Sequence, residues 1–112
     1  MRLCGDMLLG KMKLENAAFE DGAYILYPGG RMRVPTSWRE KGNYILKLSC
    51  EGEGGTVQAF ATHSFEMIGE AALVPGENSV RFTLKDDDKY FMLLIKSAEN
   101  EIRLTNLEFL KE

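Results

Sequence analysis

Short stretches in which apolar and polar residues alternate run along most of the chain. Residues 79–85 alternate cleanly, with Val80, Phe82 and Leu84 on one side and charged or hydroxyl side chains on the other. Residues 43–51 follow nearly the same pattern. A period of two residues is that of a β-strand with one face buried and the other in solvent. These segments therefore predict strands of an antiparallel sheet.

Three further segments also predict strands. Residues 90–96 are almost continuously apolar, which is typical of a central strand covered on both faces. Residues 56–64 alternate, with Val57 and Ala59 as candidates for the inner side. Residues 65–73 are ambiguous because their alanines fit a helical turn as well as a strand, and a strand is preferred.

Turn-forming residues separate these runs. Pro28–Gly30 predicts a hairpin turn between a strand at 24–27 and another at 31–34. Other predicted loops cover residues 51–55, 75–78 and 85–89. In the last segment, residues 101–110, the apolar phase slips once at 105–106, as a β-bulge would make it do. Roughly eight or nine short strands with turns about every ten residues predict an all-β fold, an antiparallel β-sandwich of jelly-roll type.

Composition is ordinary for a globular fold, with 45% hydrophobic and 28% charged residues in a chain of 112. That length predicts a single domain over residues 1–112. The net charge of -3 argues against nucleic acid or an anionic membrane as a partner. No apolar run approaches the ~18 residues of a membrane span.

The two cysteines, Cys4 and Cys50, lie too far apart to form a CxxC metal pair. Whether they are bridged stays open, and the simpler interpretation is that Cys50 packs as a small apolar residue at a strand end. Leu3–Gly5 looks superficially like a lipoprotein cleavage site, but no apolar stretch precedes it. The chain is expected to be either a cytoplasmic protein or a domain of a longer secreted one, and in the second case extracellular.

Three short motifs carry a family resemblance. Residues 16–22, Asn-Ala-Ala-Phe-Glu-Asp-Gly, resemble the N-x-x-F-E-x-G opening of carbohydrate-binding β-sandwich modules. Residues 42–46 resemble the strand with which such modules re-enter the sandwich, and residues 102–109 resemble their final strand. Together the motifs span nearly the whole chain. The resemblance implies a jelly-roll, galactose-binding-like sandwich and a non-catalytic function in binding a poly- or oligosaccharide.

The resemblance also implies a structural calcium ion. In several of these families an acidic residue in the opening motif and another in the last strand hold the ion. Glu20 matches the first position, and Asn106 or Glu108 would have to provide the second. The sequence departs from the pattern where such modules often have a tryptophan, because Tyr24 and Tyr27 stand there instead.

Aromatic residues are the first candidates for a sugar platform, because the C–H face of a pyranose packs on a flat apolar surface. Trp38 lies in a loop-like stretch beside Arg39 and is a candidate platform, with plugging one end of the sandwich as the alternative. Tyr24 and Tyr27 are out of phase on their strand, so at most one of them faces the core.

Polar candidates come from two strands. Arg31 and Arg33 share one face and could bind hydroxyls or a carboxylate, with a merely solvated face as the alternative. Gln58 and Phe60, together with Thr62, form a polar and aromatic stripe that is exposed if Ala59 faces the core.

Catalysis finds little support in the sequence. His63 and Ser64 are neighbours on a predicted strand and point to opposite faces, so they cannot form a nucleophile–base pair. The preferred hypothesis is therefore a non-enzymatic carbohydrate-binding module that accompanies other domains. A structural or protein-interaction sandwich without a small ligand is the alternative, and a small jelly-roll enzyme is the third.

Overall fold

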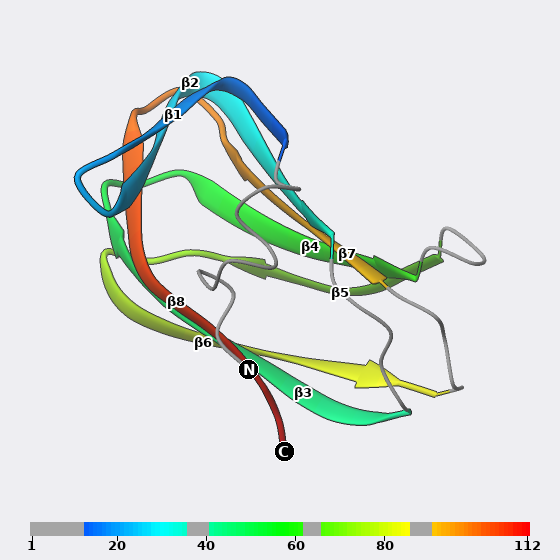
Figure 1. Cartoon of the computed structure of the whole chain (residues 1–112). Coiled ribbons are helices and arrows are strands. Elements are labelled where there is room, and N and C mark those ends of the chain that lie inside the picture. The colour runs from blue at the N-terminus through cyan, green and yellow to red at the C-terminus, as the bar shows by residue number, and fades with distance from the viewer. Residues whose placement is uncertain (1–12, 36–40, 62–65, 86–90) are drawn as a thin grey trace.

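The computed structural model describes residues 13–35, 41–61, 66–85 and 91–112, all as strands and their connections (Figure 1). The strands are β1 (Lys13–Glu20), β2 (Ala23–Pro35), β3 (Gly42–Glu51), β4 (Gly55–Ala61), β5 (Glu66–Ala72), β6 (Gly76–Leu84), β7 (Phe91–Ser97) and β8 (Ile102–Lys111). Every pairing between them is antiparallel. No helix among the described residues is long and apolar enough to cross a membrane.

The strands form two layers that share β2. Its first half, Tyr24–Leu26, pairs with β8, and its second half, Arg31–Pro35, pairs with β7. Since the pairing order is β5-β4-β7-β2-β8-β3-β6, one layer holds β5, β4, β7 and the second half of β2. We call it the β4–β7 sheet. The other, the β3–β8 sheet, holds the first half of β2 with β8, β3 and β6, and β1 pairs with β2 along both halves.

Alternating side chains fill the space between the two sheets. Val80, Phe82 and Leu84 of β6 are 8% exposed or less, as their period of two predicts. Rings of Tyr44 and Phe109 stack across β3 and β8 with centroids 5.3 Å apart. The fold predicted from the sequence, an antiparallel β-sandwich of jelly-roll type, is confirmed.

The hairpin predicted at Pro28–Gly30 is wrong. β2 runs without interruption through these residues, and the reversal lies earlier, at Asp21 and Gly22, between β1 and β2. Both turn residues have positive φ, 50° and 78°, as the Asp-Gly pair of a tight hairpin requires. Pro28–Gly30 instead bend β2 where it passes from one sheet to the other.

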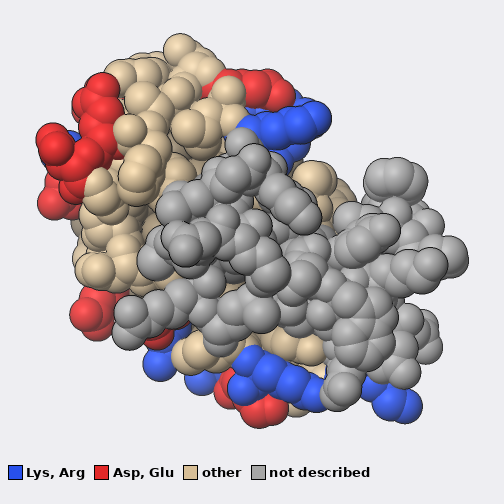
Figure 2. All heavy atoms as spheres, in the orientation of Figure 1, with Lys and Arg blue, Asp and Glu red and all other residues tan. Residues whose placement is uncertain are grey.

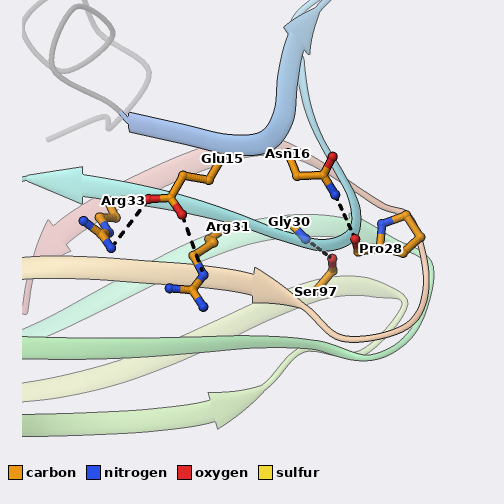
Figure 3. A network of polar contacts seen from close by, with 7 residues as sticks. All are labelled: Glu15, Asn16, Pro28, Gly30, Arg31, Arg33 and Ser97. Atoms are coloured by element: carbon orange, nitrogen blue, oxygen red, sulfur yellow. Dashed lines mark hydrogen bonds and ion pairs between the residues drawn. The ribbon is translucent and has the colours of Figure 1, made fainter.

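Ser97 holds this bend by hydrogen bonds (Figure 3). Its hydroxyl donates to the carbonyl of Tyr27 at 2.6 Å and accepts from the amide of Gly30 at 3.2 Å. On β1, the Asn16 side chain donates to the carbonyl of Pro28 at 2.8 Å. A Cβ atom on Gly30 would lie 2.8 Å from the Tyr27 carbonyl oxygen, so the bend has room only for glycine. Three segments of the chain, from β1, β2 and β7, are thereby held together at one corner.

The predicted bulge in the last strand is confirmed. Lys47 pairs with Glu108 and Ser49 pairs with Thr105, so β8 uses one residue more than β3 over the same step. The extra residue is absorbed at Asn106, which has a φ of 55°. The slip keeps apolar residues on the inner side at both ends of β8.

The structure decides three other sequence interpretations. The ambiguous stretch at 65–73 contains β5, so the preference for a strand is confirmed. The central strand, β7, is covered on one face only: Leu93 and Ile95 are fully buried, whereas Met92 and Leu94 are half-buried. Cys50 is a free thiol, 2% exposed in the core, as its interpretation as a small apolar residue predicts.

We predict that Ser97→Ala destabilises the protein by about 1–3 kcal/mol, because it leaves the Gly30 amide and the Tyr27 carbonyl without their partner in a buried corner. Urea unfolding measures the change. Ser79→Ala, at an exposed strand position, is the matched control and should stay within about 0.5 kcal/mol of the wild type. Equal effects of the two substitutions would contradict the role given to Ser97.

The free edges of the two sheets meet where Gly69 of β5 packs on Phe82 of β6. A Cβ atom on Gly69 would lie 2.5 and 3.0 Å from the Cδ1 and Cε1 atoms of that ring. We expect Gly69→Ala to cost about 1–3 kcal/mol in unfolding free energy, as overpacking does in a dense core. In a Phe82→Leu background the same substitution should cost clearly less. An unchanged cost in that background would show that the ring is not the obstacle.

Candidate functional site

The outer surface of the β4–β7 sheet brings together residues from four strands. Directly paired residues of antiparallel strands project to the same side of a sheet. Leu94 of β7 pairs with Arg33 on one side and with Gln58 on the other. The register sets the outward side chains in three rows, Arg31–Lys96–Thr56–Ala72, Arg33–Leu94–Gln58–Glu70 and Met92–Phe60–Met67. We call this surface the β4–β7 face.

An apolar strip runs along the third row of the β4–β7 face and includes Leu94 of the second row. Leu94, Met92 and Phe60 are half-buried, and Met67 is 48% exposed. Three neighbouring strands span about 10 Å, so the strip is wide enough to support a flat ring. The inner sides of β7 and β4 carry the fully buried residues Leu93, Ile95, Val57 and Ala59, which fixes the outward direction of the strip.

Two arginines border the strip on β2. Figure 3 shows Arg31 and Arg33 with the carboxylate of Glu15 between them. Glu15 contacts Arg33 at 3.6 Å and Arg31 at 4.0 Å, and all three side chains are 40–53% exposed. Ion pairs of this length and exposure add little to stability. Their effect is to orient two guanidinium groups toward the same surface.

A second polar pair borders the strip on the opposite side. The amide nitrogen of Gln58 donates a hydrogen bond to Glu70 on β5. This bond orients the Gln58 amide, which has a second N–H and a carbonyl oxygen of its own to offer a ligand. Within the second row, the apolar residue Leu94 therefore lies between two hydrogen-bonding side chains, Arg33 and Gln58.

The structure unites four of the residues predicted from the sequence. Arg31 and Arg33 come from β2, and Gln58 and Phe60 from β4, with β7 between the two strands. The sequence places Phe60 on the outer side of the sheet if Ala59 faces the core. Ala59 is fully buried and Phe60 does lie on the outer side.

The structure gives a different result for each of the predicted aromatic residues. Tyr24 is 3% exposed and belongs to the core, so it cannot be a platform; its ring packs 4.6 Å from that of Phe19. As their opposite phases on the strand predict, only one of the two tyrosines is in the core, because Tyr27 is half-buried. Tyr27 nevertheless lies just before the bend and outside the three rows of the β4–β7 face. Trp38, like Thr62 and His63, falls outside the described residues and stays a prediction.

The calcium site also stays a prediction. Glu20 is exposed at the end of β1, one residue before the β1–β2 turn. Across the described parts of the chain, no three His, Cys, Asp or Glu side chains gather in a way that could hold a metal ion. Asn106 and Glu108, the proposed second ligands, both line a groove on the outer side of the β3–β8 sheet.

That groove has a volume of about 410 Å³. It is open and polar, without an aromatic side chain, and its lining is Lys47, Leu48, Ser49, Glu77, Asn78, Ser79, Asn106 and Glu108. The Asn78 side chain already makes two hydrogen bonds of 2.9 Å with the backbone of Val74. The groove therefore lacks the flat apolar surface that the β4–β7 face has.

Sequence reasoning missed the centre of the β4–β7 face. Leu94, Met92 and Lys96 belong to the apolar run that was interpreted as covered on both sides. Lys96 at the end of that run was the available signal, because a charged residue in phase with Leu94 and Met92 marks an outward side. Glu70 was missed because β5 itself was ambiguous.

Burial and the neighbouring Glu51 carboxylate raise the pKa of the Cys50 thiol. The raised pKa keeps the thiol protonated and unreactive. The unfolded chain loses this proton near the ordinary thiol pKa of about 8.5, so the folded state binds more protons above that pH and stability falls as pH rises.

We therefore predict that the free energy of unfolding of the wild type drops more between pH 7 and pH 10 than that of Cys50→Ala. Urea titrations at several pH values measure both slopes. Cys50→Ala leaves a small cavity in the core and should therefore be less stable than the wild type at every pH. Only the pH dependence of the unfolding free energy tests the raised pKa of Cys50. Parallel slopes would contradict it.

Comparison with known proteins identifies solved structures of similar fold. No protein-family model matches the chain, and no curated protein does. Among solved structures, a CBM4 structure is similar with a TM-score of 0.69 and 10% identity over 90% of this chain and 78% of the other. A CBM29-2 mutant complexed with mannohexaose gives a TM-score of 0.58 at 12% identity over 87% and 77% of the two chains. The C-terminal CBM6 of the laminarinase LamC from Zobellia galactanivorans gives 0.57 at 18% identity over 88% and 93%.

The chain has the fold of a carbohydrate-binding module. This confirms the resemblance that the three sequence motifs indicate. At 10–18% identity the likeness concerns the fold alone, so the ligand has to be argued from the residues of the β4–β7 face.

Proposed function

We propose that the protein is a non-catalytic carbohydrate-binding module and that it binds an oligo- or polysaccharide on the β4–β7 face. The observation that supports this best is the row Arg33–Leu94–Gln58, in which one apolar residue lies between two hydrogen-bonding side chains. A pyranose has the matching properties, with apolar C–H faces and hydroxyl groups around its edge.

The distribution of carboxylates on the face supports binding rather than hydrolysis. In the part of the chain that the structure describes, the carboxylates of this face are Glu15 and Glu70, on β1 and β5. These strands are four positions apart in the sheet, on the order of 19 Å. The carboxyl pair of a glycosidase is only about 5–9.5 Å apart.

Trp38 is part of the proposal as a further stacking group. It follows Pro35, and Pro35 pairs with Met92 at the end of the apolar strip. β2 therefore ends beside the strip, three residues before Trp38 in the sequence. Tyr27 is kept as a peripheral candidate because it is half-buried and lies at the bend, before Arg31.

The alternative is an interaction domain that contacts neighbouring domains of a larger chain. The exposure of Val74 at 55% and of Phe19 at 45% favours it, since both are large apolar side chains outside the β4–β7 face. Phe19 is partly accounted for by its contact with Tyr24.

Binding to a broad glycan panel, followed by calorimetry on each hit, tests the function. We expect Phe60→Ala, Gln58→Ala and Trp38→Ala each to weaken binding about 5- to 150-fold, which corresponds to roughly 1–3 kcal/mol for a stacking contact or a bidentate bond. Thermal unfolding of each variant separates lost affinity from lost stability.

Arg81→Ala is the matched control. Arg81 is exposed on β6, in the other sheet, and is paired with Glu112 at 3.1 Å. It should leave binding unchanged. Parallel titrations with calcium and with EDTA, repeated on Glu20→Gln, test the calcium site. Failure to bind any glycan at high protein concentration would overturn the proposal in favour of the interaction domain.

A further inference from the structure

The β4–β7 face has a local charge opposite in sign to that of the whole chain. Among the described residues, its basic side chains are Lys13, Arg31, Arg33 and Lys96, against the carboxylates Glu15 and Glu70, whereas the whole chain carries a net charge of -3. Exposed acidic residues also lie beyond the Lys96 end of β7, at the end of β3 and in the connections that follow β3 and β7, at Glu51, Glu53, Glu99 and Glu101. In Figure 2 a group of acidic side chains lies at the upper left, whereas at the upper right and along the bottom basic and acidic side chains lie next to each other.

Two cations face each other directly across β2 and β7. Arg31 pairs with Lys96, and the other strand neighbour of Lys96 is Thr56. Along β7, the next residue on the same side is Leu94. Like charges directly opposite each other destabilise a sheet. The pair therefore has a cost in the free protein that a bound anion would remove.

Glu15 compensates only part of this charge. It is the carboxylate with which Arg31 and Arg33 form ion pairs among the described residues, and it is shared between them at 4.0 and 3.6 Å. Each guanidinium has five N–H donors, and the ammonium of Lys96 has three. One carboxylate with two oxygens cannot occupy this set of donors.

We propose that the saccharide bound by the β4–β7 face is anionic, and that its carboxylate or sulfate group binds between Arg31 and Lys96. This inference rests on the proposed function. Arg31 offers the planar fork that binds either oxyanion in two-point contact, and Lys96 adds a second positive charge. With the anionic group at this row, the sugar ring lies over Leu94 in the next row, about 7 Å further along β7. Uronates and sulfated sugars share this chemistry.

Calorimetry with three oligosaccharides of similar length tests the inference: an oligogalacturonate, an oligosaccharide of a sulfated galactan, and neutral mannohexaose. We expect at least one of the two anionic probes to bind ten or more times more tightly than mannohexaose at low salt. That preference should shrink at about 1 M NaCl, where the Debye length falls to about 3 Å. The probe that binds decides between a carboxylate and a sulfate ester.

Substitutions locate the anion. Arg31→Gln and Lys96→Gln should each weaken binding of the anionic probe about tenfold or more and weaken mannohexaose binding by a clearly smaller factor. Arg81→Gln removes the same charge from the opposite sheet and should change neither. Urea unfolding of all three variants excludes a loss of fold as the cause.

The outcomes are distinct. Equal or tighter binding of mannohexaose, unaffected by Lys96→Gln, would overturn the anionic specificity and leave the proposed function standing. Absence of binding to every saccharide would overturn both. Poly-L-glutamate of matched charge is the remaining control: if it binds as tightly as the anionic sugar, the basic residues act only as an ion exchanger and the inference is wrong.

Discussion

The structure depends on the bend in β2. At this corner one buried hydroxyl, that of Ser97, accepts from the Gly30 amide and donates to the Tyr27 carbonyl. Without these bonds two backbone groups would be buried unpaired, so the strand could not pass from one sheet to the other. The passage matters because the same strand supplies the core of both sheets, through Leu26 before the bend and Met32 after it. The sandwich is closed at this side by covalent chain rather than by packing alone.

The bend also fixes where the arginines point. Because β2 continues as a regular strand, the burial of Met32 and Val34 leaves Arg31 and Arg33 on the outer side. Pairing with β7 then places them in rows with Lys96 and Leu94. Side chains anchored on paired strands hold their spacing better than side chains on loops. The β4–β7 face is therefore a rigid surface whose chemistry follows from strand register.

Local patterns predict the strands and the bulge but not the neighbours of each strand. The alternation in β6 and the phase slip in β8 are properties of single segments, and both are seen in the structure. The hairpin predicted at Pro28–Gly30 is wrong because proline and glycine occur in a bend within a strand as well as in a hairpin turn. The two are distinguished only by the hydrogen bond from Gly30 to Ser97, 67 residues away. For the same reason Arg33 and Gln58 could be identified separately, whereas their common neighbour Leu94 could not.

The fold likeness leaves the ligand undetermined, because sandwiches at 10–18% identity share a core and not a surface. What distinguishes this chain is the positive charge on the described part of its β4–β7 face against its net charge of -3. In water, the cluster of Arg31, Arg33, Lys96 and Glu15 is weakly repulsive and easily screened. Under a ligand, the same groups lose part of their solvent and interact more strongly. A neutral sugar would bury Arg31 and Lys96 without neutralising them, whereas an anionic sugar would supply the missing counter-charge. Desolvation thus turns a minor surface repulsion into a preference for one class of saccharide.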